Sequence, residues 1–268
     1  MEKTAGNPEL VTIGSAQLWN GRAEEVLDRV GERAAGMIFT DPPYGHGNND
    51  GDLISNREAA LGRGSGHAPR PIANDASEDD ADALFELVLA QAPLVLSGGG
   101  CCCCCCCCGG GPDPQFARWA MRMNHMLDFK QMVVWDKGKM GLGWHYRRSY
   151  ETVLVGAVRG GKHRWFDTSG KVENIIRPGD YGIRKIIPNA NEHPTRKPVA
   201  LAAHFIRLHT RAGETVLDPF MGSGTTGVAA LREGRSFIGI ELERRWFEQA
   251  CARIRRVVEG KEAIKDRR

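Results

Sequence analysis

Short apolar runs alternate with segments of helical periodicity along most of the chain. The apolar runs predict strands at residues 10–13, 37–40, 94–96, 132–135, 152–158, 215–217 and 237–240. The periodic segments predict helices at residues 23–33, 79–92, 115–127, 198–209 and 225–232, and from Arg244 onward. Because strands that alternate with helices form mostly parallel sheets, we expect an α/β fold with a doubly wound, mostly parallel sheet.

Two segments lack a clear period and interrupt this pattern. Residues 45–75 are rich in Gly, Asn, Asp and Pro, which predicts a long loop or a lid. Residues 159–192 are basic, contain glycines and are also expected to be irregular. We find neither an internal repeat nor a convincing linker, so we expect a single domain over residues 1–268 with a small inserted lobe.

Composition and charge fit a soluble globular protein: of 268 residues, 41% are hydrophobic and 26% are charged. The formal net charge of +3 is weak support for nucleic-acid binding, so any basic surface must be local. The start, MEKTAGNPEL, lacks the apolar core of a signal peptide. No apolar run approaches the roughly 20 residues that span a bilayer. We therefore expect a cytoplasmic protein without a membrane partner.

Eight of the nine cysteines occupy consecutive positions, residues 101–108, and the ninth is Cys251. A disulfide scaffold spreads its cysteines along the chain, and zinc motifs space them, so the run resembles neither. Because free cysteine behaves as a small hydrophobic residue, a strand flanked by glycines is the simplest interpretation. Metal or redox chemistry of the run stays open as an alternative, and no metal ligand is assigned.

A carboxylate, two prolines and an aromatic ring directly follow the predicted strand at 37–40, in the sequence TDPPYG. Proline lacks a backbone donor and cannot continue a strand inside a sheet, so the strand must end here. A plain turn would also end the strand, but turns rarely need this order of groups. We therefore take Asp41, Pro42, Pro43 and Tyr44 as a candidate functional site and not as a plain turn.

A glycine-rich loop follows the predicted strand at 215–217, in the sequence LDPFMGSGTTG. Its G-x-G-x-x-G pattern alone would suit a dinucleotide. In dinucleotide-binding proteins the glycines directly follow the strand and cradle a pyrophosphate, whereas Asp218 and Pro219 intervene here. A carboxylate at this point would repel a phosphate and favour a ligand with positive charge. No lysine follows the second glycine, so the loop is not a P-loop either.

Glu241 ends the next predicted strand, 23 residues (241 − 218) after Asp218. An acid at this place can accept hydrogen bonds from both hydroxyls of a ribose. The two features together predict a pocket for a nucleoside with a cationic tail. S-adenosyl-L-methionine has a ribose, a sulfonium and an ammonium group, and is the expected cofactor. A helix-capping loop with a surface acid is the alternative interpretation.

These motifs together resemble those of the amino-group DNA methyltransferases, which methylate the exocyclic nitrogen of adenine or cytosine. TDPPYG is similar to the family's catalytic motif, and LDPFMGSGTT and the strand that ends at Glu241 are similar to its cofactor motifs. HPTRKP, residues 193–198, is similar to the segment before the cofactor strand, and the catalytic motif comes first, as in the family's β class. The resemblance covers nearly the whole chain and implies a Rossmann-like methyltransferase fold, S-adenosyl-L-methionine as cofactor and double-stranded DNA as substrate.

The resemblance also implies what the catalytic motif does. Asp41 and the Pro42 carbonyl would accept the N–H groups of the target amine and leave its lone pair aimed at the methyl donor. Tyr44 would stack on a base extracted from the duplex. An aspartate at the first position favours adenine N6, because the cytosine-N4 members more often carry serine there, so cytosine N4 is the alternative target. A catalytically silent DNA-binding module and a nicotinamide-dependent oxidoreductase are further alternatives.

By the same resemblance, a set of residues is expected to bind the cofactor. They are Ser15, Thr195, Lys197, Asp218, Pro219, Phe220, Gly222, Ser223, Gly224, Thr225, Thr226 and Glu241. Thr195 and Lys197 would lie near the methionyl end, where the lysine could meet the carboxylate. Ser15 stands where the family usually has an acid that contacts the cofactor's adenine.

Residues 136–192 are the candidate target-recognition region, because basic and aromatic side chains are interleaved there. The members are Lys137, Lys139, Trp144, Tyr146, Arg147, Arg148, Arg159, Arg164, Trp165, Tyr181, Arg184 and Lys185, and Trp135 directly precedes them. Glu151 matches an acid that is often found at this place in the family. A homodimer and a cognate restriction endonuclease are the further partners that the resemblance suggests, in a bacterial cell or a phage-infected host.

Overall fold

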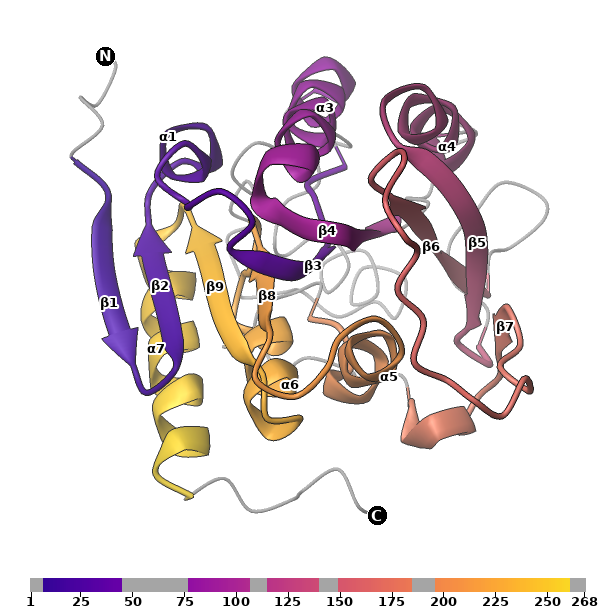
Figure 1. Ribbon diagram of the computed structural model, residues 1–268. Coiled ribbons are helices and arrows are strands. Elements are labelled where there is room, and N and C mark those ends of the chain that lie inside the picture. Colours follow the sequence, from indigo (N-terminus) through magenta and orange to yellow (C-terminus); the bar gives the residue numbers. More distant parts are fainter. Residues whose placement is uncertain (1–6, 45–76, 107–114, 140–148, 185–195, 261–268) are drawn as a thin grey trace, which may run out of the picture.

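The computed structural model describes residues 7–44, 77–106, 115–139, 149–184 and 196–260. Within these residues a nine-stranded sheet runs through the molecule in the order β1-β2-β9-β8-β3-β4-β6-β5-β7 (Figure 1). The strands are β1 (Glu9–Ile13), β2 (Ala16–Asn20), β3 (Ala35–Thr40), β4 (Leu96–Cys106), β5 (Asp128–Asp136), β6 (Tyr150–Ala157), β7 (Ile175–Ile176), β8 (Thr215–Asp218) and β9 (Ser236–Glu241).

The middle of the sheet is parallel. Strands β2, β9, β8, β3 and β4 pair in parallel with their neighbours, whereas β1 pairs antiparallel with β2 at one edge. On the other side, β6 runs antiparallel to both β4 and β5. The predicted doubly wound, mostly parallel sheet is confirmed, and its parallel centre brings the carboxyl ends of β3, β8 and β9 to one edge.

Helices cover both faces of the sheet (Figure 1). The helices are α1 (Ala23–Leu27), α3 (Glu78–Val95), α4 (Gln115–Met126), α5 (Val199–His209), α6 (Thr225–Arg232) and α7 (Arg244–Val258), with a 3-10 helix η1 (Asp180–Gly182). In Figure 1, α1, α3 and α4 lie above the sheet and α5, α6 and α7 lie below it.

Each face of the sheet buries its own apolar cluster. Successive residues of β3 point to opposite faces: Met37 joins the cluster under α5, α6 and α7, and Ile38 joins the one under α1, α3 and α4. Val216 and Leu217 of β8 divide in the same way. Strands that are buried on both faces are read as continuous apolar runs, which is why these two were visible in the sequence.

The N-terminal hairpin differs from the sequence prediction. The chain turns at Gly14, whose φ of +57° is in the left-handed region, and returns as β2, a strand that was not predicted. Ala16 and Leu18 of β2 are buried, so the period of two was present but short. The helix predicted at residues 23–33 ends at Leu27, and the strand predicted from residue 94 starts at Leu96 because α3 continues to Val95.

The described part of the cysteine run, residues 101–106, lies in β4, between β3 and β6. The strand assignment is therefore confirmed, and its pairing is irregular. Leu96 lies opposite Ala35 and Cys101 opposite Met37, so five steps on β4 face two on β3. This bulge falls on the sequence SGGG, where glycine tolerates the bend. Cys101 and Cys251 are buried free thiols.

The predicted target-recognition region shares the main sheet. Strand β6 lies between β4 and β5, while β7 and η1 extend the edge beyond β5. Within the described segments, no helix is both long and apolar enough to cross a bilayer.

Candidate active site

The two predicted motifs meet at the carboxyl edge of the parallel strands. Strand β3 ends at Thr40, β8 at Asp218 and β9 at Glu241. The hydroxyl of Thr40 donates to Asp218 Oδ1 at 2.7 Å, and both side chains are buried. This bond ties the residue before Asp41 to the first residue of the cofactor loop, although 178 positions separate them in the chain.

Asp41 follows β3 directly, and other side chains hold both of its carboxylate oxygens. Lys197 Nζ donates to Oδ2 at 2.6 Å, and the Tyr44 hydroxyl donates to Oδ1. Burial raises the pKa of Asp41, whereas Lys197 and Tyr44 oppose that rise. The side chain keeps 22% of its surface exposed, so a ligand from outside can still reach the carboxylate.

Lys197 lies between two carboxylates. Its ammonium is 3.6 Å from Glu151 Oε2 on β6, in addition to its contact with Asp41. Lys137, the residue after β5, donates to the other oxygen of Glu151 at 2.9 Å. The Lys197 ammonium also lies 5.8 Å from the centre of the Tyr44 ring. The contact of Lys197 with the methionyl end of a cofactor stays a prediction.

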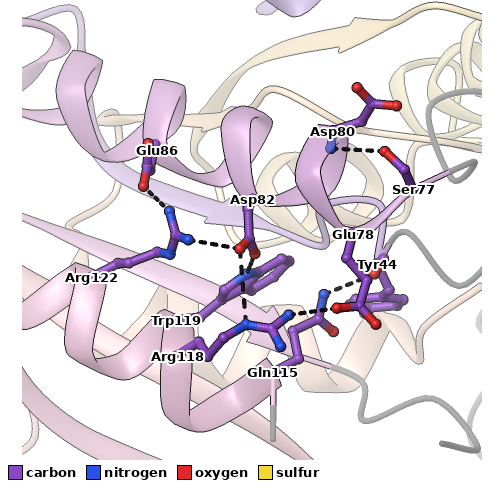
Figure 2. A network of polar contacts seen from close by, with 10 residues as sticks. All are labelled: Tyr44, Ser77, Glu78, Asp80, Asp82, Glu86, Gln115, Arg118, Trp119 and Arg122. Carbon is purple, nitrogen blue, oxygen red and sulfur yellow. Dashed lines mark hydrogen bonds and ion pairs between the residues drawn. The ribbon is translucent and has the colours of Figure 1, made fainter. Parts of the chain in front are cut away.

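Tyr44 is anchored to the layer formed by α3 and α4 (Figure 2). Gln115, the first residue of α4, is buried and donates from Nε2 to the Tyr44 carbonyl at 2.8 Å. The rings of Tyr44 and Trp119 have centroids 6.2 Å apart, and Trp119 stacks on Phe85 at 4.3 Å. Trp119 Nε1 on α4 donates to Asp82 on α3 at 2.6 Å. The predicted catalytic motif therefore packs against two helices that are hydrogen-bonded to each other.

The carboxylate of Asp218 organises its own loop. It is 3% exposed and accepts hydrogen bonds from the Thr40 hydroxyl, the Phe220 N–H at 3.1 Å and the Thr226 side chain. Burial raises its pKa to about 6, against the effect of these donors, and the nearby charge of Asp41 adds to the rise. Its negative charge lies beside the loop that is predicted to face the cofactor.

The glycines of the loop allow close packing against α7 and β9. Gly224 has φ of +79°, and a Cβ there would lie 2.9 Å from Cβ of Ala250. A Cβ on Gly227 would lie 2.6 Å from the ring of Phe237. Arg253 on α7 donates to the Ser223 carbonyl at 2.6 Å and to its hydroxyl at 3.1 Å. The loop is thus held by its contacts with α7 and β9. Arg253 was not predicted, because an arginine in a helix carries no local sequence signal.

Glu241 accepts hydrogen bonds from two backbone donors of its surroundings. The Gly222 N–H donates to Oε2 at 3.0 Å and the Glu243 N–H donates to Oε1 at 2.7 Å. Burial raises its pKa to about 7, against both hydrogen bonds. Each carboxylate oxygen has a further lone pair, so the side chain can still accept from the hydroxyls of a ribose. These residues therefore fit a nucleoside cofactor.

Asn20 is a neighbour of this acid that sequence reasoning missed. It ends β2, the unpredicted strand, and lies opposite Glu241 in the pairing with β9. Its Nδ2 donates to the carbonyls of Glu241 at 2.9 Å and Leu242 at 3.1 Å. Recognising β2 from the alternation of Ala16 and Leu18 would have placed it here.

The structure does not bring Ser15 to the other predicted cofactor residues. Ser15 lies in the hairpin turn before β2, and its carbonyl accepts from the N–H of Phe237 near the start of β9. Glu241 ends that strand, so the two residues lie at opposite ends of the sheet. The prediction assumed that β1 leads into the site, whereas the chain first turns back through β2. Thr195 lies outside the described residues.

A basic cavity lies beside the Asp41 site. Its volume is about 250 Å³, and its lining includes Trp135, Lys137, Lys139, Pro178 and Arg184. Because Lys137 also contacts Glu151, the cavity adjoins the chain of ion pairs that ends at Asp41.

Other basic residues of the predicted recognition region have structural partners. Arg159 donates to the carbonyls of Asn124, His125 and Leu127 near the end of α4. Arg164 pairs with Glu214. Trp165 and Tyr181 are exposed. The remaining members, Trp144, Tyr146, Arg147, Arg148 and Lys185, lie outside the described residues.

Several known proteins are similar to this chain. The DNA adenine methyltransferase YhdJ of Escherichia coli (strain K12) is 27% identical over 265 residues, which cover 88% of this chain and 81% of the relative. The type II methyltransferase M2.DpnII of Streptococcus pneumoniae is 46% identical over 71 residues, 26% of each chain.

Solved structures agree on the fold. The M1.HpyAVI–SAM complex has a TM-score of 0.62 at 23% identity, with 89% of this chain and 98% of that chain covered. The PvuII DNA methyltransferase (cytosine-N4-specific) has a TM-score of 0.63 at 19% identity, with 93% and 94% covered. The model of a family described as DNA methylase matches residues 35–252. The chain therefore belongs to the DNA methylase family and uses S-adenosyl-L-methionine as its methyl donor.

Proposed function

We propose that this enzyme methylates the N6 amino group of adenine in double-stranded DNA. The observation that carries the proposal is the Asp41 carboxylate at the tip of β3, which the Thr40–Asp218 hydrogen bond joins to the cofactor loop. The aspartate at the first position of the motif favours adenine over cytosine. The name of the E. coli relative, a DNA adenine methyltransferase, supports the same target.

The cofactor half of the site is proposed to bind the donor through Glu241, the glycine loop and the charge of Asp218. Bound S-adenosyl-L-methionine supplies an electrophilic methyl group on a sulfonium. Glu241 accepts the ribose hydroxyls, and Gly222 and Gly224 allow the backbone to approach the ligand closely. The buried carboxylate of Asp218 provides negative potential that favours a cationic ligand beside the loop.

The acceptor half acts on the amino group of the base. The lone pair of an exocyclic amine is delocalised into the ring, so the amine is a poor nucleophile until its nitrogen becomes pyramidal. Asp41 and the Pro42 carbonyl accept its two N–H groups and stabilise the positive charge that develops on nitrogen. Tyr44 supplies a ring against the base, and Gln115 holds the Tyr44 backbone in place.

The basic cavity is proposed to contact the DNA backbone. Lys137, Lys139 and Arg184 supply positive charge at its rim, and phosphate contacts of this kind position a duplex without reading its sequence. We also propose a homodimer, a cognate restriction endonuclease as partner and a cytoplasmic location. The type II name of the S. pneumoniae relative supports the restriction-modification setting.

Transfer of a labelled methyl group from S-adenosyl-L-methionine to duplex DNA tests the proposal. Digestion of the product to nucleosides should yield N6-methyladenine, and N4-methylcytosine would instead establish the alternative target. Asp41→Ala should lower the transfer rate by at least about 10²-fold while donor affinity changes by less than about threefold. Asp79→Ala, an exposed acid in the first turn of α3, is the matched control and should keep the wild-type rate. Full activity of Asp41→Ala would exclude the proposed mechanism.

A further inference from the structure

The ammonium of Lys197 has two carboxylates within reach, and the two contacts differ in length. It is 2.6 Å from Asp41 Oδ2 and 3.6 Å from Glu151 Oε2. The first is a short charge-assisted hydrogen bond and the second is an ion pair without hydrogen-bond length. In the molecule without DNA, the lysine is therefore bonded to the proposed catalytic aspartate.

That position conflicts with the proposed chemistry. The Asp41 carboxylate must accept an N–H of the target amine, and the Tyr44 hydroxyl already donates to its other oxygen. The amine gains positive charge as it is methylated, and a lysine ammonium on the same carboxylate repels that charge. The ammonium therefore has to leave Asp41, at least in part, when the amine enters.

Glu151 is built to receive it. The residue lies on β6, opposite Trp135 of β5, so the sheet fixes its backbone. Lys137, directly after β5, donates to Oε1 at 2.9 Å, and Oε2 is the oxygen that lies nearer to Lys197, at 3.6 Å. Lys197 precedes α5 and carries its charge on a flexible four-carbon stem, so a small rotation can shorten the contact with Glu151 to about 2.8 Å.

We propose that Glu151 is a positioning residue that takes the Lys197 ammonium from Asp41 as the amino group of the target base enters. Before entry, Lys197 neutralises a carboxylate that is largely buried. After entry, the amine replaces the ammonium at Asp41, and the ammonium of Lys197 is hydrogen-bonded to Glu151. The inference rests on the proposed function, but it holds for any exocyclic amine and does not depend on which base is the target.

Single-turnover methyl transfer with saturating duplex DNA and donor tests this role in Glu151→Gln. The amide keeps the size of the side chain but cannot compete with Asp41 for a cation. We expect the transfer rate to fall about tenfold. A factor of ten has the free energy of a shift of about one pKa unit, which is typical when one neighbouring charge is lost. The dissociation constants of donor and DNA should change by less than about twofold. Glu248→Gln, which alters an exposed ion pair on α7 outside the candidate target-recognition region, should behave as the wild type.

A second variant separates this role from a merely structural one. If Glu151 acts through Lys197, the double variant Glu151→Gln/Lys197→Met should be no slower than Lys197→Met alone. A wild-type rate in Glu151→Gln, or a further tenfold loss in the double variant, would overturn the inference. Transfer by the wild type to cytosine would reject the adenine assignment and leave this comparison valid. Absence of transfer by the wild type to any base would reject the proposed function itself.

Discussion

The two halves of the site hold their carboxylates in different ways. Asp41 is bonded by two side chains, the flexible Lys197 and the anchored Tyr44. Glu241 is bonded by the backbone N–H groups of Gly222 and Glu243. Backbone donors on a folded loop cannot leave without unfolding it, whereas a lysine can rotate away. The cofactor half is therefore a fixed frame, and the acceptor half can be rearranged when a substrate enters.

Asp218 belongs to the fixed half although it lies next to Asp41. Its partners are a hydroxyl on β3, a backbone N–H and a threonine on α6, and all lie in the folded core. If this distinction is right, removing Asp218 should damage the fold, and removing Asp41 should damage only the chemistry.

Asp218→Ala should have the largest effect on stability. The substitution removes the carboxylate that accepts from three donors: the Thr40 hydroxyl, the Phe220 N–H and the Thr226 hydroxyl. We expect the free energy of unfolding to fall by about 2–3 kcal/mol and donor binding to be lost. Asp41→Ala should change it by less than about 1 kcal/mol, because Lys197 keeps Glu151 as a partner. Urea unfolding of both variants measures the difference, and equal losses would contradict the distinction.

Lys197→Met should have the next largest effect, on the pH dependence of transfer. The titratable groups that face Asp41 are Lys197, Tyr44 and Glu151, with Asp218 beyond them. Burial already raises the pKa of Asp41, and without the lysine only the hydrogen bond from Tyr44 opposes that rise. Protonated Asp41 cannot accept an N–H, so the rate at pH 7 should fall between about 10- and 100-fold and recover as pH rises. A stopped-flow pH profile with the same slope as the wild type would contradict this reasoning.

The elements that carry the strand tips of the site could be predicted from the sequence. Helix α6 has the predicted bounds, and β3, β8 and β9 lie where their apolar runs placed them. The strand tips then follow from topology, because carboxyl ends of parallel strands share an edge. The roles of the individual residues at those tips stay predictions.

The rest depends on contacts that leave no local pattern. Lys197 and Asp41 are 156 positions apart, and Gln115 reaches Tyr44 across 71 positions. Only the packing of α4 and α5 on the sheet determines which of many polar side chains meet. Ser15 was misplaced for a simpler reason: a five-residue strand, β2, was overlooked, so the chain turns back at Ser15 and does not enter the site there.

Glu241→Gln should have the smallest effect, and it tests the fixed half directly. Burial raises the pKa of Glu241 to about 7, so much of it is protonated below neutral pH. A donor whose ribose hydroxyls bond to the carboxylate favours the ionised form, so the wild-type dissociation constant should fall as pH rises from about 6 to about 8. The amide does not titrate, so the variant should lose this dependence and bind about tenfold more weakly at the upper pH. Calorimetry in buffers of different ionisation heat would also record proton release by the wild type and none by Glu241→Gln.

Glu243→Gln is the control variant. It keeps the N–H that donates to Glu241 but removes a like charge that raises the pKa of Glu241, so the midpoint of the pH dependence of donor binding should shift to lower pH with the dependence intact. A wild-type pH dependence in Glu241→Gln would show that another group titrates in the cofactor site.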